Sequence, residues 1–124
     1  MTHNFLQVAL GGAIGASARY GVNILAGRIA PGLPLGTLTV NVLGCLAMGM
    51  LASLLALRGG QHLAPLLLTG VLGGFTTFSA FALDTMTLWE RGAGGQAIGY
   101  VLASVVLSLV AVMAGLAIGR GVFA

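Results

Sequence analysis

The sequence predicts an all-α membrane protein with four transmembrane helices, the third of which is broken. Of its 124 residues, 58% are hydrophobic and only 6% are charged, and the mean hydropathy is +1.07. Soluble domains carry about 25% charged residues, so this composition cannot form a water-exposed surface. The five arginines also separate apolar segments long enough to cross a hydrocarbon core, which takes roughly 20 helical residues. Adjacent glycines and threonines interrupt the third of these segments.

The four spans use most of the chain and form one domain, residues 1–124. The links between them are a Pro/Gly turn and the short sequences RGGQH and ERGAGG. Links this short force consecutive helices to lie antiparallel as neighbours. We predict the helices over Phe5 to Ala26, Leu35 to Leu57, Leu63 to Leu88 and Gln96 to Gly119.

Glycine is abundant, with 21 residues, and recurs at close-packing intervals such as Gly11 with Gly15 and Gly70 with Gly74. In lipid, small residues let helix backbones approach closely, so we expect a tightly packed bundle. The sequence LGGFTTFSAF in the third span is different, because Gly-Gly weakens a helix. Backbone groups freed there survive at membrane depth only when they are buried in protein or face a polar cavity. We therefore predict a break across GGFTT.

The arginines give only a weak preference for one orientation in the membrane. With four spans, Arg58 and Arg120 lie on one side, and Arg28, Arg91 and Arg19 belong to the other. Because lysine and arginine near the membrane ends set orientation, a difference of three against two hardly selects one. We expect insertion both ways and an antiparallel pair. A bundle of four helices is also too thin to enclose a pathway alone, which favours a dimer.

Two predicted helices carry polar side chains four residues apart, which places them on one face of each helix. One interpretation is structural, because Ser and Thr often form hydrogen bonds between membrane helices. Asn is more costly to bury, so this structural interpretation is weaker for Asn41. The two faces are rich in hydrogen-bond donors and contain no carboxylate, a combination that suits an anion. They consist of Thr37, Asn41 and Cys45 on the second span and Tyr100, Ser104 and Ser108 on the fourth.

Phe75, Phe78 and Phe81 are spaced three apart around the predicted break. Such spacing usually indicates core packing. Aromatic rings also carry a positive edge, so Phe78 and Phe81 would stabilise a desolvated anion if their edges faced the same cavity as Asn41.

The few charged residues leave two questions open. Arg19 within the first span is a functional candidate because it is an intramembrane charge, with snorkelling or hydrogen bonds to loop carbonyls as alternatives. Asp84 keeps a proton-coupled exporter in consideration, although the first two spans contain no Asp or Glu. No serine has a histidine base in reach, and no clustered basic patch is present. We expect neither an enzyme nor a nucleic-acid partner.

Three motifs occur in order along the chain: GGAIGASARY, GTLTVNVLG and GVLGGFTTFSAF, at residues 11–20, 36–44 and 70–81. Together they closely resemble the Fluc/CrcB family of fluoride channels over essentially the whole chain. The resemblance implies a dual-topology antiparallel homodimer in a prokaryotic inner membrane, with two fluoride pores and a central sodium ion. It also implies a passive, fluoride-selective channel that lets the anion leave the cytoplasm down its electrochemical gradient.

The resemblance also implies roles for individual residues. The backbone carbonyls of Gly73 and Thr76 align with the positions that hold the sodium ion, and Ala80 departs slightly from relatives that have Thr or Ser there. The resemblance implies for Arg19 either a structural role or a place in the vestibule, the entrance to the pore. The residues assigned to the fluoride pore are Asn41, Phe78, Phe81, Thr37, Ser79, Tyr100, Ser104 and Ser108.

Overall fold

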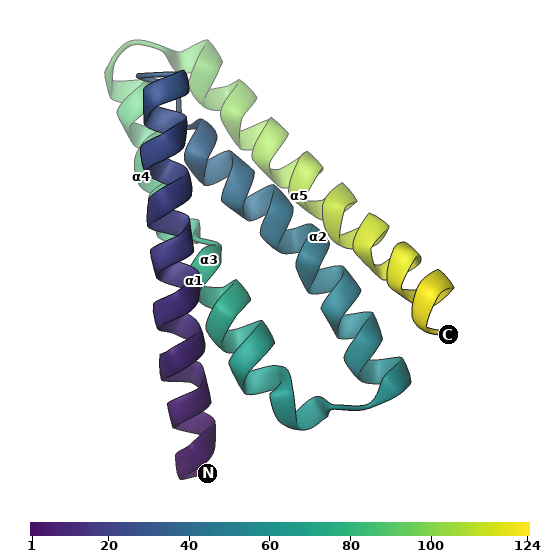
Figure 1. The fold of residues 1–124 in the computed structure, drawn as a ribbon. Helices are drawn as coiled ribbons and strands as arrows, with labels where there is room; N and C mark the ends of the chain where they lie inside the picture. Colours follow the sequence, from purple (N-terminus) through teal and green to yellow (C-terminus); the bar gives the residue numbers. More distant parts are fainter.

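The computed structural model describes residues 1–124, and its regular structure is entirely helical (Figure 1). Two long helices come first, and a third helical segment follows in four pieces before a final long helix. This arrangement agrees with the predicted all-helical fold class, and the long helices extend up to four residues beyond the predicted bounds, although α2 begins at the predicted residue. The elements are α1 (Thr2–Ile29), α2 (Leu35–Arg58), η1 (Gln61–Leu63), η2 (Pro65–Leu72), α3 (Gly73–Phe75), α4 (Phe78–Glu90) and α5 (Gly94–Phe123).

The helices pack mainly in pairs. α2 lies along α5, whereas α1 packs against η2 and α3, and α4 contacts α5. In Figure 1 the helices converge at the end where α1 leads into α2 and α4 leads into α5, and they spread apart toward the two chain termini. The break between α3 and α4 lies near the middle of the bundle.

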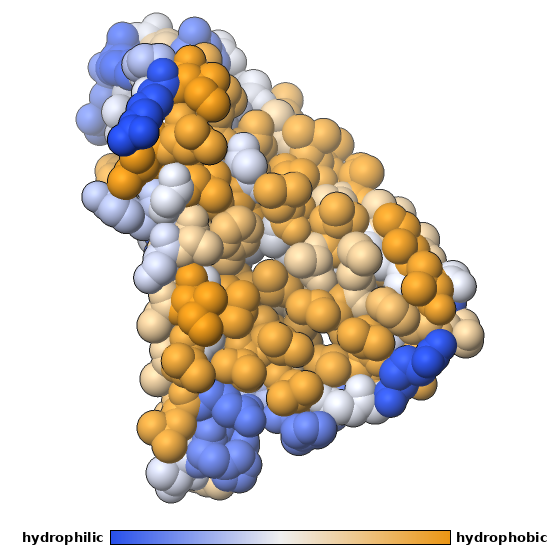
Figure 2. Space-filling model, viewed as in Figure 1, coloured by the Kyte–Doolittle hydropathy of each residue, from blue (hydrophilic) through white to orange (hydrophobic).

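The surface is apolar along most of the helices. Three segments are long and apolar enough to cross a membrane: Leu35–Arg58, Gln61–Glu90 and Gly94–Phe123. α1 has 28 residues but is less apolar, because polar residues such as Arg19 and Asn23 interrupt it. Hydrophobic residues cover much of the face in Figure 2, and hydrophilic residues gather at the ends. Large exposed side chains such as Leu102 and Met113 suit lipid rather than water, as expected for a membrane protein.

Glycines allow the helix pairs to touch backbone to backbone. A methyl group added at Gly49 would collide with the carbonyl oxygen of Val112, and one added at Gly115 would collide with that of Leu46. Because lipid does not drive helices together, this close van der Waals contact is a main source of attraction between α2 and α5.

The break differs in one respect from its prediction, because Gly73 and Gly74 remain helical. Gly73 has φ −63° and ψ −36°, whereas Thr76 (φ −91°, ψ 159°) and Thr77 (φ −155°, ψ 128°) are extended. The expectation that Gly-Gly itself opens the helix was therefore wrong. A methyl group at Gly74 would lie 2.8 Å from the carbonyl oxygen of Gly12, so this glycine serves close packing against α1. The β-branched threonines suit the extended conformation.

Candidate functional site

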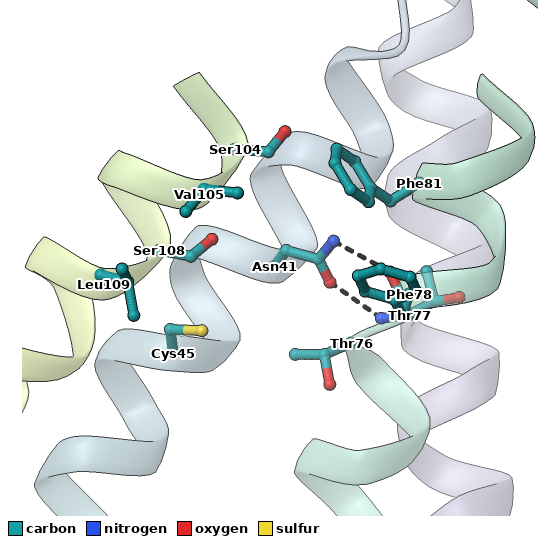
Figure 3. Close-up of a pocket in the computed structure, with 10 residues that line it drawn as sticks. All are labelled: Asn41, Cys45, Thr76, Thr77, Phe78, Phe81, Ser104, Val105, Ser108 and Leu109. Atoms are coloured by element: carbon teal, nitrogen blue, oxygen red, sulfur yellow. Dashed lines mark hydrogen bonds between the residues drawn. The ribbon is translucent and has the colours of Figure 1, made fainter. Parts of the chain in front are cut away.

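Asn41 holds the break open from the neighbouring helix α2. Its Nδ2 donates to the Thr77 carbonyl at 3.0 Å, and its Oδ1 accepts from the Thr77 N–H at 2.8 Å (Figure 3). The Thr77 hydroxyl in turn accepts from the N–H of Ala80 at 3.2 Å and caps α4. Side chains therefore replace the backbone hydrogen bonds that Thr77 gives up, as buried polar groups require.

Arg19 contacts the same break from α1. Its Nε donates to the Gly74 carbonyl at 3.0 Å, and the side chain is half-buried. The guanidinium thus satisfies a carbonyl whose usual helical donor, four residues further on, is displaced by the extended threonines.

Three other carbonyls at the break have no donor within the chain. They belong to Gly73, Phe75 and Thr76, and the N–H groups that would normally reach them are directed elsewhere or displaced. An unsatisfied carbonyl at membrane depth costs several kcal/mol. These oxygens are therefore available to a partner from outside the chain.

A pocket of about 350 Å³ lies between α2, α5 and the break (Figure 3). None of its ten lining residues is charged. They are Asn41, Cys45, Thr76, Thr77, Phe78, Phe81, Ser104, Val105, Ser108 and Leu109.

The pocket offers hydrogen-bond donors that the chain does not use fully. The Ser104 hydroxyl is buried without a partner, and the residue is only 6% exposed. Asn41 spends one of its two amide hydrogens on Thr77 and keeps the other. The N-terminus of α4, the positive end of the helix dipole, also begins at the pocket with Phe78. The pocket thus combines free hydrogen-bond donors with the positive end of a helix dipole, and none of its side chains is charged. This combination is suited to binding an anion.

The two phenylalanines meet edge to face at the pocket. The ring centroids of Phe78 and Phe81 are 5.5 Å apart with planes at 64°, and Phe81 lies 5.3 Å from Tyr100. Phe78 is 78% exposed, which is unusual for a large aromatic ring at a pocket. The pocket is therefore open on the side of Phe78.

The structure brings together five residues assigned to the pore from the sequence, and it places three others outside the pocket. Thr37 and Tyr100 are buried about one helical turn beyond Asn41 and Ser104. The Tyr100 hydroxyl donates to Asp84 Oδ2 at 3.2 Å. Ser79 is exposed, and its hydroxyl lies 3.3 Å from that of Thr77. The five pocket residues are Asn41, Phe78, Phe81, Ser104 and Ser108.

Comparison with known proteins places this arrangement in a family. The family model described as CrcB-like protein, Camphor Resistance (CrcB), matches residues 6–116. The chain belongs to the CrcB-like family. This finding confirms the resemblance that the three sequence motifs indicate.

Several relatives of this CrcB-like chain carry the name fluoride-specific ion channel FluC. The relative from Paracoccus denitrificans is 78% identical over 124 residues, which is 100% of both chains. The relative from Cereibacter sphaeroides is 56% identical over 122 residues, 98% of each chain. The relative from Agrobacterium fabrum is 50% identical over 123 residues, 97% of this chain and 98% of its own.

Sequence reasoning missed some of the residues that line the pocket of this CrcB-like protein. Cys45 was placed on the same helix face as Asn41 but was not assigned to the pore, and it is half-buried and lines the pocket. Its position four residues after Asn41 was a usable signal. Thr77 gave no such signal, because the partner of its backbone lies 36 residues away. Val105 and Leu109 were indistinguishable from other apolar residues of α5 before the helix orientation was known.

Proposed function

We propose that this chain is a passive, fluoride-selective channel that lets fluoride leave the cytoplasm down its electrochemical gradient. The observation that carries the proposal is the uncharged pocket, which contains free donors and lies at the N-terminus of a half-helix. Helix N-termini at a break in a membrane protein are directed at anionic substrates in other transport proteins. The name of the relatives, fluoride-specific ion channel, supports fluoride as the anion.

The pocket geometry is suited to replacing the water around a small anion. Asn41, Ser104 and Ser108 supply N–H and O–H donors, and the edges of Phe78 and Phe81 supply weak positive charge. Tyr100 and Thr37 continue the polar track beyond the pocket, and Ser79 lies at the start of α4. Since no lining residue carries a full positive charge, the ion is held weakly enough to leave, as conduction requires.

We infer that the working unit is an antiparallel homodimer in the prokaryotic inner membrane, with all four long helical segments crossing the lipid bilayer. The exposed ring of Phe78 and the uncovered wall of the pocket support a second copy as the missing wall. The near balance of arginines between the two ends supports insertion in both orientations. α1 is long enough to cross the bilayer, because 28 residues at about 1.5 Å each exceed its thickness.

A sodium ion bound by the carbonyls of Gly73 and Thr76 fits the break. Both oxygens lack a donor within the chain, whereas Arg19 covers the carbonyl of Gly74. The structure contains no group of three or more His, Cys, Asp or Glu residues that could hold a metal. Carbonyls without carboxylates favour a monovalent cation over calcium or magnesium. A sodium ion would supply positive charge to carbonyls that have no other partner.

The function is tested by anion flux from proteoliposomes that contain only this protein. We expect rapid, electrogenic fluoride efflux that continues when the proton gradient is abolished, and chloride efflux at background level. A proton-coupled exporter would instead lose fluoride efflux with the proton gradient. Equal rates for fluoride and chloride would contradict fluoride selectivity.

Sodium removal tests the role of the break carbonyls. With sodium replaced on both sides by a bulky organic cation, we expect fluoride efflux to fall to background, because the break loses the cation that organises its oxygens. Efflux should return when sodium is added back, and potassium serves as the comparison ion. Full efflux in rigorously sodium-free conditions would show that the carbonyls find another partner.

A further inference from the structure

A second pocket, of about 170 Å³, lies at the end of the bundle where the link after α1 meets the end of α4. It shares no residue with the pocket of Figure 3. Unlike that pocket, it contains two side chains of opposite charge. Its lining residues are Gly32, Leu33, Pro34, Asp84, Thr87, Leu88 and Arg91.

A chain of three contacting side chains joins the two pockets. Phe81 lines the first pocket, and its ring lies 5.3 Å from the ring of Tyr100. Tyr100 donates its hydroxyl hydrogen to Asp84, which lines the second pocket. The polar side chains that continue from the first pocket therefore end, through Tyr100, at the Asp84 carboxylate of the second pocket.

The carboxylate alone would repel an arriving anion, and Arg91 supplies the opposing charge. Arg91 Nη2 donates to the Gly32 carbonyl at 3.2 Å, which holds the guanidinium over the link between α1 and α2. A guanidinium has five N–H groups, so most of its donors remain free for an anion. The neighbouring Glu90 does not line the pocket. Asp84 and Arg91 together leave it without net charge.

We propose that this second pocket is an outer binding site for a small anion, and that Arg91 draws the anion into it against the field of Asp84. The proposal rests on the proposed function, because it assigns the mouth of the same pathway. Attraction by an exposed charge is strong when few salt ions are present and weak when many are. Arg91 should therefore affect flux in a salt-dependent manner, which a purely structural contact would not.

The test compares initial fluoride efflux from proteoliposomes containing wild type, Arg91→Gln and Arg91→Lys. Each is measured at ionic strengths of about 0.01 M and about 1 M, where the screening lengths are about 30 Å and about 3 Å. A salt with an impermeant organic anion sets the ionic strength. We expect Arg91→Gln to lower efflux about fivefold at low salt and less than about twofold at high salt. Arg91→Lys should stay near wild type, since it keeps the charge.

Arg28→Gln is the matched control, because it removes an arginine from the same end of the bundle without touching the pocket. It should leave efflux near the wild-type rate at both salt concentrations. If it lowers efflux as much as Arg91→Gln, general surface charge is responsible and the outer site is overturned. A salt-independent loss in Arg91→Gln, or an equal loss in Arg91→Lys, would assign Arg91 to holding the link in place.

The outcomes also separate this inference from the proposed function. A wild-type protein that carries no fluoride overturns the function itself. A wild-type protein that carries fluoride, alongside an Arg91→Gln variant with unchanged efflux at low salt, overturns only the outer site.

Discussion

Asn41→Asp should reduce fluoride efflux to background. The substitution keeps an oxygen that accepts from the Thr77 N–H but replaces the donating Nδ2 with a second oxygen, which faces the Thr77 carbonyl. It also places a negative charge in the pocket. Two like charges about 4 Å apart repel by about 4 kcal/mol at an effective dielectric constant of about 20, which corresponds to nearly a thousandfold in rate. Fluoride efflux from proteoliposomes measures the loss.

Asn4→Asp provides the control for this variant, because it makes the same chemical change at an exposed position near the start of α1. Its efflux should match wild type. Both variants should also elute as wild type does on size exclusion, so that loss of folding is separated from loss of conduction. Wild-type efflux from Asn41→Asp would remove Asn41 from the pathway and from the break.

Gly15→Ala should destabilise the protein more than other single-methyl changes in α1. A methyl group at this position would collide with the Val71 carbonyl and lie 2.8 Å from the Phe75 nitrogen. Both atoms belong to backbone, so α1 would have to move away from η2 and α3. Overpacking of this kind costs about 1–3 kcal/mol, and we expect the Tm in detergent to fall by about 10 °C.

Gly21→Ala is the matched control on the same helix. Nothing lies within 4 Å of a methyl group there, and alanine favours helix over glycine by about 1 kcal/mol. Its Tm should therefore equal or slightly exceed that of wild type. Equal Tm values for the two variants would mean that α1 and the third segment do not pack backbone to backbone.

Periodic and compositional features of the fold could be predicted from the sequence. The long apolar segments gave the helices, because the length of a helix in a membrane is fixed by the thickness of the bilayer. The four-residue spacing correctly grouped Asn41 with Cys45 and Ser104 with Ser108, because residues four apart share a helix face. These features depend only on neighbours along the chain.

Features that depend on contacts between distant residues could not be predicted in detail. Of the predicted GGFTT break only Thr76 and Thr77 are extended, because Gly74 is needed for contact with α1 and Asn41 binds Thr77. The placement of Tyr100 beside Asp84 likewise depends on how α4 lies on α5. The π-helical turns of η2 have no marker in the sequence that we could identify.

The hydrogen bonds between Asn41 and Thr77 have a consequence for the order of folding. The Thr77 hydroxyl replaces the lost hydrogen bond of the Ala80 N–H, but the Thr77 N–H itself has its partner 36 residues away, on Asn41. Alone in lipid, this segment would keep its own backbone bonds and insert as an uninterrupted helix, since every backbone group must be satisfied there. The kink then arises only when α2 docks. Assembly of the bundle, rather than insertion of its parts, therefore creates the break that borders the pocket.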